Sequence, residues 1–301
     1  MTPGQRFRAA WDAERPLQVV GVINAYCARL AEQAGFRALY LSGAGVANAA
    51  FGLPDLALTT LSEVVEEARR ITDVTSLPLL VDVDTGFGTA LNIARMVREL
   101  TGAGVAALHI EDQVAAKRCG HRPGKQLVAI TEMQDRIRAV VDARSDPELV
   151  VMARTDAFAT EGLDGVIRRA QAYVDVGADA IFAEALTELK SYAILTRTVS
   201  VPVLANATEF GRTPIFDREE FHAAGVRLVL YPLTAFRAMG QAAQETYETI
   251  RESGSQKPLM ARLQTRDALY RVLGYWAYER KLDQLFGAEK PPPSSSEEDP
   301  R

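Results

Sequence analysis

Two aspartates separated by one residue, Asp82 and Asp84, follow a short apolar run of the sequence. Carboxylates at positions i and i+2 can both reach one point beyond a strand end if the chain turns there, and Gly86-Phe87-Gly88 permits such a turn. Hard oxygen ligands without a nearby Cys or His pair favour Mg2+, with Mn2+ as the alternative, over zinc. An Asx-turn followed by a helix N-cap is the structural alternative, because this two-aspartate pattern alone is a weak signal.

The segment Lys117-Arg118-Cys119-Gly120-His121 carries the second set of candidate residues. Free cysteines are usually buried in apolar runs, whereas Cys119 lies in a polar loop that contains glycine. The neighbouring cations and the histidine should favour its thiolate form. The pattern therefore predicts a nucleophile or a proton donor, and an exposed loop cysteine is the alternative. Cys27, at the start of an expected helix, is predicted to be a packing residue.

Regular elements must hold these residues, and the chain alternates short apolar runs with amphipathic stretches. The predicted strands are Val19–Ile23, Ala38–Leu41, Leu79–Val81, Val105–Ile110, Leu149–Ala153, Ala180–Ala183, Pro202–Ala205 and Arg227–Tyr231. Near-continuous apolar strands are typical of a parallel sheet covered on both faces. Eight strand–helix repeats predict an α/β fold of the (β/α)8 barrel type. An open doubly wound sheet would need a glycine-rich phosphate loop after the first strand, and Gly21-Val22-Ile23-Asn24 is not one.

Polar residues follow the apolar runs at the end where a barrel places its active site. In strand order they include Asn24, Ser42, Asp82, Glu111, Arg154, Glu184, Asn206 and Tyr231. Entry into a loop explains Asn, Asp and Ser, but turns do not favour Glu111, Arg154 or Glu184. Acids clustered at one barrel mouth repel each other unless a cation offsets them, which favours metal binding over the turn alternative. His109, inside a strand, is expected to be a hydrogen-bonded core residue.

Composition excludes several classes of protein. With 34 basic and 39 acidic residues among 301, the formal charge of −5 argues against a nucleic-acid partner. No apolar stretch is long enough for a membrane span, and no signal peptide is visible, so we expect a cytoplasmic protein. We expect a barrel domain over residues 1–255 and an aromatic-rich helical extension over residues 256–288. The Pro-, Ser- and Glu-rich tail over residues 289–301 should be disordered.

In order along the chain, these motifs resemble the isocitrate lyase and phosphoenolpyruvate mutase superfamily, and within it the 2-methylisocitrate lyases. The Lys117–His121 loop is similar to the superfamily signature. The other matching segments are Leu41–Gly43, Gly52–Asp55, Asp82–Gly88, Glu111–Gln113, His121–Pro123, Ala153–Asp156, Asn206–Gly211 and Tyr231–Leu233. The resemblance runs from about residue 6 to residue 286, and only the tail falls outside it. One departure is Ala44, where the family pattern has a third small glycine.

The resemblance implies a Mg2+-dependent retro-aldol cleavage of 2-methylisocitrate, a small tricarboxylate, to pyruvate and succinate in the methylcitrate cycle. It implies that Asp82 and Asp84 hold the ion, partly through water, and that Cys119 protonates the succinate carbanion. Further implied catalytic residues are Lys117, His121 and Asp55, with Tyr40 as the candidate base. The implied substrate-binding residues are Ser42, Gly43, Ala44, Cys119, Gly120, Arg154, Glu184, Asn206, Ala207, Thr208, Arg237 and Arg266. The implied pocket for the substrate methyl group consists of Phe182, Leu230 and Pro232.

The resemblance also implies a mobile lid over Lys117–Leu127, with Gly120 and Gly124 as hinge points, that closes over the substrate. It further implies a homotetramer in which subunits exchange the C-terminal helical extension.

Several alternatives remain at this point. An isocitrate lyase is the nearest one, because a single methyl group is worth only about 1–3 kcal/mol of discrimination. A phosphoenolpyruvate mutase would lack the cysteine loop, and an oxaloacetate decarboxylase would not need its acid. A dimethylmalate lyase is a further alternative within the superfamily. A non-catalytic barrel would be expected to have an incomplete site.

Overall fold

The computed structural model describes residues 1–287, so the predicted tail over residues 289–301 lies outside the described residues. The chain divides into two compact units, Met1–Glu248 and a second unit that begins at Thr249. Eight parallel strands of the first unit pair in sequence order and close into a barrel, which confirms the predicted fold. The strands are β1 (Leu17–Gly21), β2 (Ala38–Leu41), β3 (Leu79–Asp82), β4 (Ala107–Glu111), β5 (Val150–Thr155), β6 (Ala180–Ala183), β7 (Val203–Asn206) and β8 (Leu228–Tyr231).

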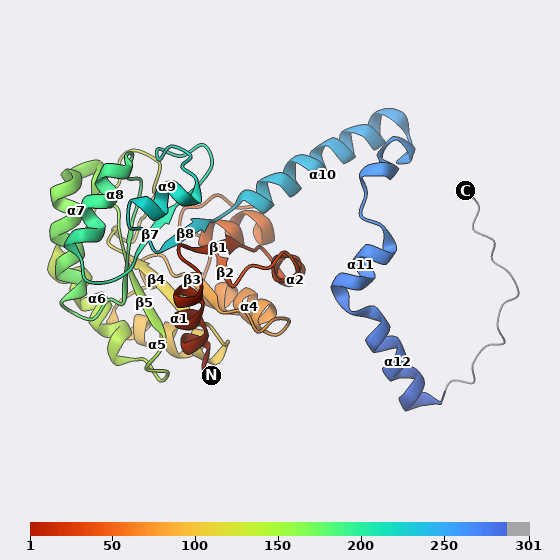
Figure 1. The fold of residues 1–301 in the computed structure, drawn as a ribbon, viewed down its shortest axis with the longest axis horizontal. Coiled ribbons are helices and arrows are strands. Elements are labelled where there is room, and N and C mark those ends of the chain that lie inside the picture. The colour runs from red at the N-terminus through yellow and green to blue at the C-terminus, as the bar shows by residue number, and fades with distance from the viewer. Residues whose placement is uncertain (288–301) are drawn as a thin grey trace, which may run out of the picture. The chain divides into compact units, whose positions relative to one another are not determined.

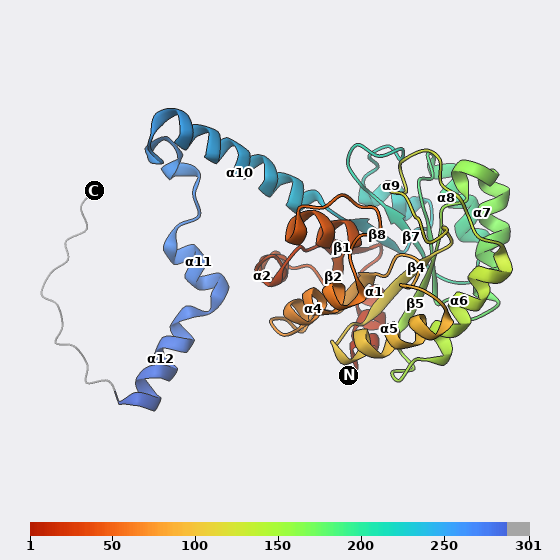
Figure 2. The same ribbon diagram turned by 180° about the vertical axis from the view of Figure 1, so that it is seen from behind.

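Helices connect the strands and cover the outside of the barrel, as Figures 1 and 2 show for α5 to α8. The helices of the first unit are α1 (Pro3–Ala13), α2 (Ala25–Gln33), α3 (Gly43–Gly45), the π-helix η1 (Val46–Ala50), α4 (Leu61–Thr72), α5 (Ala90–Gly102), α6 (Ile130–Asp142), α7 (Phe158–Val174), α8 (Leu189–Thr198) and α9 (Arg218–Ala223). Helix α10 (Thr234–Ser253) runs across the boundary between the two units.

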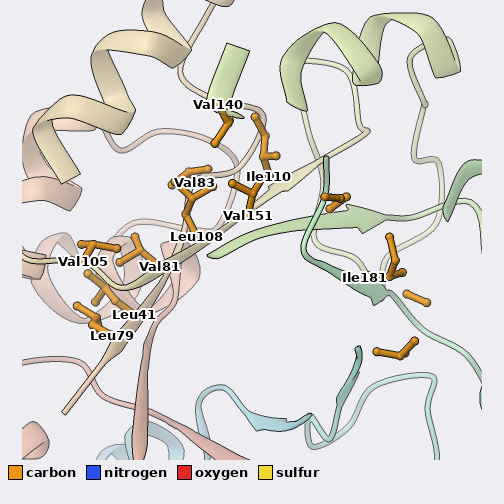
Figure 3. Packing of buried hydrophobic residues seen from close by; sticks show 14 of the residues in the cluster. Leu41, Leu79, Val81, Val83, Val105, Leu108, Ile110, Val140, Val151 and Ile181 are labelled. Atoms are coloured by element: carbon orange, nitrogen blue, oxygen red, sulfur yellow. The ribbon is translucent and has the colours of Figure 1, made fainter. Parts of the chain in front are cut away.

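Successive residues of each strand face opposite sides of the barrel wall, which separates two apolar layers. The outer layer packs strands against helices, and Figure 3 shows Leu108, Ile110 and Val151 of β4 and β5 beside Val140 of α6. The inner layer fills the barrel itself and contains residues such as Leu17. Because all strands are parallel, the inner residues of every strand run in the same direction, from an apolar floor to the mouth of the barrel.

Helix α1 was not predicted, and it closes the floor of the barrel. Its fully buried Phe7 and its Trp11 belong to the inner apolar layer, with ring centroids 5.8 Å apart and an interplanar angle of 76°. Thr2 caps the helix by accepting a hydrogen bond from the backbone N–H of Gln5. The helix has only four buried residues, so its apolar spacing was too short to be recognised as a pattern.

Strand β1 begins and ends two residues earlier than predicted, so the prediction that Asn24 directly follows it is wrong. The Asn24 side chain instead caps α2 by accepting a hydrogen bond of 2.9 Å from the N–H of Cys27. An asparagine side chain competes with a strand ladder for backbone donors, so the cap ends the extended segment. Cys27 is buried, as predicted for a packing residue.

The second unit contains a 3-10 helix, η2 (Lys257–Arg262), followed by α11 (Arg266–Leu273) and α12 (Tyr275–Phe286). Tyr270 stacks on Tyr275 with ring centroids 4.1 Å apart. Trp276, Tyr278 and Phe286 are exposed, at 45%, 66% and 77% of their surface. No helix within residues 1–287 combines the length and apolar character that crossing a bilayer requires.

The inner apolar layer should dominate the stability of the first unit. Leu17, with 0% of its surface exposed, packs in that layer, whereas Leu91 on α5 is 82% exposed. We expect Leu17→Ala to lower the free energy of unfolding by about 2–5 kcal/mol, because it removes buried methyl groups and leaves a cavity. The matched Leu91→Ala variant should change it by no more than about 0.5 kcal/mol. Urea unfolding followed by circular dichroism measures both, and equal effects would contradict this assignment of the core.

Candidate active site

The inner side of the barrel wall changes from apolar to polar toward the mouth. Along β5 the inward residues are Val150 and Met152, and Arg154 follows them at the next inward position. On the neighbouring β4, His109 and Glu111 occupy the corresponding positions, and Glu111 pairs in register with Arg154. A cavity of about 320 Å³ opens above this polar layer. It is lined by Tyr40, Ser42, Ala44, Asp55, Asp82, Lys117, Cys119, Gly120, His121, Arg154, Phe182, Glu184, Asn206, Thr208, Leu230, Pro232 and Arg237, among others.

Arg154 lies at the centre of this layer and is paired with three buried acids. Its Nε lies 2.9 Å from Asp156 Oδ2 and 3.2 Å from Glu111 Oε2, and its Nη2 lies 3.2 Å from Glu184 Oε2. The Glu184 carboxylate also accepts hydrogen bonds of 3.3 Å from Asn206 Nδ2. The residues predicted at four strand ends, Glu111, Arg154, Glu184 and Asn206, are therefore joined into one polar cluster.

Burial and charge act differently on the acids of this cluster. Burial raises the pKa of Glu184, but Arg154 and His121 outweigh it and hold that pKa well below its usual range. Burial raises the pKa of Glu111 well above its usual value, and Arg154 offsets this only in part. Glu184 is therefore a fixed negative charge at the cavity wall, whereas Glu111 is the acid of this cluster that holds a proton more readily.

Asp82 and Asp84 lie close together at a tight turn, where Asp84 contacts Lys117. The N–H of Asp84 donates to Asp82 Oδ1 at 3.1 Å, so the Asx-turn considered as the structural alternative is present. Asp84 has a φ of 47° and Gly86 one of 95°, which places both in the left-handed region that a turn of this kind requires. A Cβ built on Gly43 would lie 3.2 Å from Asp82 Oδ2 and 3.4 Å from Asp84 Oδ1, so the two carboxylates approach one point.

The two aspartates differ in pKa. Burial raises the pKa of Asp84 to about 6, reinforced by the charge of Asp82. Burial also acts on Asp82, but His109, Lys117 and Arg154 lower its pKa to about 2. The Lys117 ammonium lies 2.7 Å from Asp84 Oδ1 and 2.5 Å from Asp55 Oδ1. Neighbouring carboxylates raise the pKa of Lys117 above its usual range despite its burial. A buried cation therefore already sits beside the aspartate pair.

The donor set at Asp82 and Asp84 fits a hard divalent cation. Both carboxylates are buried, and Asp84 Oδ1 contacts the Lys117 ammonium but accepts no hydrogen bond of standard geometry in the described part of the chain. Within residues 1–287, no group of three or more His, Cys, Asp and Glu side chains is arranged to hold a metal. A cation at this pair would therefore need water or substrate for its remaining ligands.

Tyr40 and His109 lie beneath the aspartate pair, and His109 was not recognised as a site residue. Tyr40 Oη lies 3.0 Å from His109 Nε2 and donates to Asp82 Oδ2 at 3.4 Å. His109 Nε2 lies 3.6 Å from Asp82 Oδ1, while its buried Nδ1 has no partner among the described residues. Burial lowers the pKa of His109 to about 4 and raises that of Tyr40 well above its usual value. His109 is thus buried as expected, but only one of its nitrogens is hydrogen-bonded.

Hydrogen bonds between flanking residues hold the loop that carries Cys119. Gln113 and Leu127 form an antiparallel bridge, and the Gln113 side chain bonds the backbone of Arg118 at 2.8 and 3.0 Å. Gly120 lies directly on the charged cluster, because a Cβ there would approach Arg154 Nη2 to 2.5 Å and Glu184 Cγ to 2.6 Å. Close approach, rather than a positive φ, is what requires a glycine at this position.

His121 connects this loop to two further elements. Its Nε2 lies 3.1 Å from Glu184 Oε1, and its Nδ1 accepts a hydrogen bond of 3.0 Å from the N–H of Arg212. The second contact assigns Nδ1 as an acceptor, which leaves Nε2 as the nitrogen that carries a proton toward Glu184. The imidazole is therefore oriented by the loop after β7.

Apolar and cationic groups form the rest of the cavity wall. Phe182 lies under the Arg154 guanidinium, 5.0 Å from it, and makes an edge contact with His109 at 5.2 Å. Leu230 and Pro232 also line the cavity. Arg237 lies over the ring of Phe210 at 5.6 Å, with its Nε 3.4 Å from Glu209 Oε2.

Three of the residues expected to bind substrate do not line the cavity. Gly43 lies just behind it and donates its N–H to Asp82 Oδ2 at 3.1 Å. Ala207 packs in the outer apolar layer. Arg266 begins α11 in the second unit, and its role stays a prediction. The remaining expected binding residues lie around the one cavity.

Two residues of the site were missed by sequence reasoning. His109 could have been found from its spacing, since it lies two residues before Glu111 on the inward side of β4 and pairs in register with Asp82. Lys125 follows the cysteine loop and is buried, although lysine in a loop normally indicates a solvated charge. No local pattern in the sequence distinguishes it from an exposed lysine.

Known proteins are similar to this chain in both sequence and fold. Residues 7–251 match the family model described as phosphoenolpyruvate phosphomutase. A 2-methylisocitrate lyase of Escherichia coli (strain K12) is 57% identical over 286 residues, which cover 95% of this chain and 97% of that protein. The crystal structure of 2,3-dimethylmalate lyase, a member of the PEP mutase/isocitrate lyase superfamily, is 34% identical with a TM-score of 0.87, covering 95% of this chain and 96% of the other.

A structure of phosphonopyruvate hydrolase in complex with oxalate and Mg2+ is 30% identical, with a TM-score of 0.83, and covers 95% of this chain and 99% of the other. The E. coli relative and the two solved structures each cover 95% of the chain, and the family model spans most of the barrel. The chain therefore belongs to the phosphoenolpyruvate phosphomutase family, within the PEP mutase/isocitrate lyase superfamily.

Proposed function

We propose that the protein is a carbon–carbon lyase that cleaves 2-methylisocitrate to pyruvate and succinate. The observation that carries the proposal is that Cys119, Asp82 and Arg154 line one cavity, with Asp84 directly beside Asp82. The high identity to 2-methylisocitrate lyases over nearly the full chain supports the substrate.

The cleavage is a retro-aldol step that breaks the bond between C2 and C3 of the substrate. Loss of the proton from the C2 hydroxyl lets that oxygen form the ketone of pyruvate, and the bonding electrons stay on C3. The adjacent carboxylate delocalises this charge, and the thiol of Cys119 donates the proton that completes succinate. Arg154 would hold a substrate carboxylate, because a guanidinium with fixed partners is preorganised for such a bidentate contact.

Tyr40 is the group we propose to accept the hydroxyl proton. Its phenol lines the cavity beside Asp82. Burial and the charge of Asp82 raise its pKa, whereas Arg154 lowers it, so the phenol holds its proton in the unliganded protein. To accept the hydroxyl proton, Tyr40 would therefore first pass its own proton to His109 Nε2, which lies 3.0 Å from Tyr40 Oη. Lys117, held by Asp55 and Asp84, adds a second positive charge near the developing oxyanion.

We propose Asp82 and Asp84 as the ligands of one Mg2+, with Mn2+ as the alternative. Bound there, the ion would supply positive charge to the substrate hydroxyl and its adjacent carboxylate and so lower the cost of the alkoxide. The two converging oxygens beside Gly43 support this assignment. The Mg2+ named in the phosphonopyruvate hydrolase complex also supports it.

We further propose that the protein acts in the cytoplasm as a homotetramer whose subunits exchange the helical extension over residues 256–288. Trp276, Tyr278 and Phe286 support this, because large exposed aromatic side chains on short helices are typical of surfaces that another chain covers.

The substrate is tested by mixing the protein and Mg2+ with 2-methylisocitrate, and separately with isocitrate, and measuring the 2-oxoacid released. We expect pyruvate from 2-methylisocitrate at a higher kcat/KM than glyoxylate from isocitrate. Cys119→Ser should lower kcat by about 10²- to 10⁴-fold, because it replaces the proposed acid with a much weaker one. Treatment with EDTA should abolish activity, and added Mg2+ should restore it. If neither compound yields a 2-oxoacid, the proposed reaction is wrong.

The metal site is tested by titrating Mn2+ into the protein and following the free ion by electron paramagnetic resonance. We expect Asp82→Asn and Asp84→Asn each to weaken Mn2+ binding by at least about 10- to 100-fold, since loss of even an outer-shell partner costs that much. Asp164→Asn, on the exposed face of α7, is the matched control and should leave the affinity unchanged. Unaltered binding in both site variants would place the ion elsewhere.

The placement of Cys119 is tested at Gly120, where an added methyl group meets the Arg154–Glu184 pair. We expect Gly120→Ala to lower kcat by about 10²-fold, because a displacement of about 1 Å at the reacting group costs that much. Gly102→Ala is the control, since a Cβ at Gly102 has no neighbour within 4 Å. Activity in Gly120→Ala equal to that of the control would show that the close approach does not position the cysteine.

A further inference from the structure

We propose that Lys125 is a positioning residue that fastens the cysteine loop to the charged cluster and so sets the closed position of Cys119. The proposal deepens the proposed function and rests on it for the kinetic effect, although the structural effect can be measured separately. Lys125 is 7% exposed, and its ammonium reaches inward from the end of the loop.

The Lys125 ammonium contacts both the loop and the barrel wall. Its Nζ donates to the carbonyl oxygen of Gly120 at 2.5 Å and to Asp156 Oδ1 at 2.8 Å. Gly120 lies in the middle of the loop, next to Cys119, whereas Asp156 directly follows β5 of the barrel wall. One side chain therefore connects the loop to the wall.

The geometry at Gly120 shows what this contact controls. The carbonyl that Lys125 binds belongs to the peptide between Gly120 and His121, so the contact fixes the orientation of that peptide plane. The His121 imidazole lies on one side of this peptide, against Glu184, and Cys119 precedes it. Releasing the carbonyl would free the peptide to rotate, and with it the two side chains that the proposed reaction uses.

Electrostatics gives the contact its strength. Asp156 is fully buried, and its carboxylate is shared between Arg154 and Lys125. Arg154 must also serve Glu111 and Glu184, so three buried acids depend on one guanidinium unless a second cation is present. Lys125 supplies that second cation only while the loop lies in place. Opening of the loop would leave Asp156 to Arg154 alone, and removal of a partner from a buried charge is costly.

The position of Asp156 is itself fixed from below. Its N–H donates to Asp112 Oδ1 at 3.0 Å, and Asp112 Oδ2 accepts hydrogen bonds from Thr155 and Tyr173 at 2.7 and 2.8 Å. Arg169 adds a further contact to Asp112 at 3.3 Å and pairs with Glu161 on the same helix. The anchor that Lys125 binds is thus a rigid part of the wall, so the movable partner is the loop.

The experiment compares Lys125→Met, which removes the donor and the charge, with Lys125→Gln, which retains a donor without the charge. Lys190→Met, at an exposed lysine on α8, is the matched control. The first readout is the rate at which iodoacetamide alkylates Cys119 without substrate, with peptide mapping to separate it from Cys27. The second readout is kcat and KM for 2-methylisocitrate, and thermal melting reports whether each variant is folded.

We expect Lys125→Met to raise the alkylation rate of Cys119 by about tenfold or more, the effect typical of losing a hydrogen bond from a charged group. Its kcat should fall by a larger factor than KM changes, because the loop positions groups for the chemical step. Lys125→Gln should lie between this variant and the wild type in both readouts, and Lys190→Met should match the wild type.

An unchanged alkylation rate in folded Lys125→Met would overturn the proposal, and if that variant does not fold, the same result in Lys125→Gln would overturn it. If the wild type releases no pyruvate while alkylation still responds to Lys125, the positioning role holds and the proposed reaction fails. If pyruvate is released but neither readout responds to Lys125, the reaction holds and the positioning role fails.

Discussion

The sharing of one buried guanidinium among three carboxylates is the constraint on which the rest of the site depends. Arg154 contacts Glu111, Asp156 and Glu184, which come from three neighbouring strands. Charges buried at this depth are stable only when paired with good geometry, so the ends of β4, β5 and β6 must stay in register. The register is fixed because the strands are parallel and form a closed barrel. The walls of the cavity above the cluster are held in place by the same strand pairing.

The inward side of each strand explains how a stable core and a charged site occupy one barrel. Apolar residues fill the floor, where α1 closes the end with Phe7 and Trp11. Polar residues occupy the next inward positions, where the wall meets the loops. The distance from floor to mouth is only two or three inward residues per strand. The residues that stabilise the barrel and the residues proposed for the reaction therefore occupy adjacent layers. Hydrogen bonds to Asp82 and from Asp156 connect the site to the residues beneath it.

Sequence patterns located the strands and the polar residues at the ends of β2 to β8, because both depend on local properties of a few adjacent residues. They failed where the outcome depends on distant partners. His109 belongs to the site because it pairs in register with Asp82 on the neighbouring strand. Lys125 belongs to it because its ammonium contacts Asp156, which lies in another segment of the chain. Helix α1 was missed because its burial depends on an open barrel floor, which exists only once the strands have closed. The metal ligands and the order of proton transfers stay predictions.

Phe182 has a consequence for any attempt to redesign the pocket. Its ring forms part of the apolar wall, lies under the Arg154 guanidinium and touches His109 by its edge. A smaller or larger residue there would enlarge or fill the pocket, but it would also remove the surface on which the guanidinium rests. A substitution at Phe182 therefore changes the size of the pocket and the position of the Arg154 charge together. Directed evolution toward a bulkier substrate would need a second substitution that restores the support for Arg154.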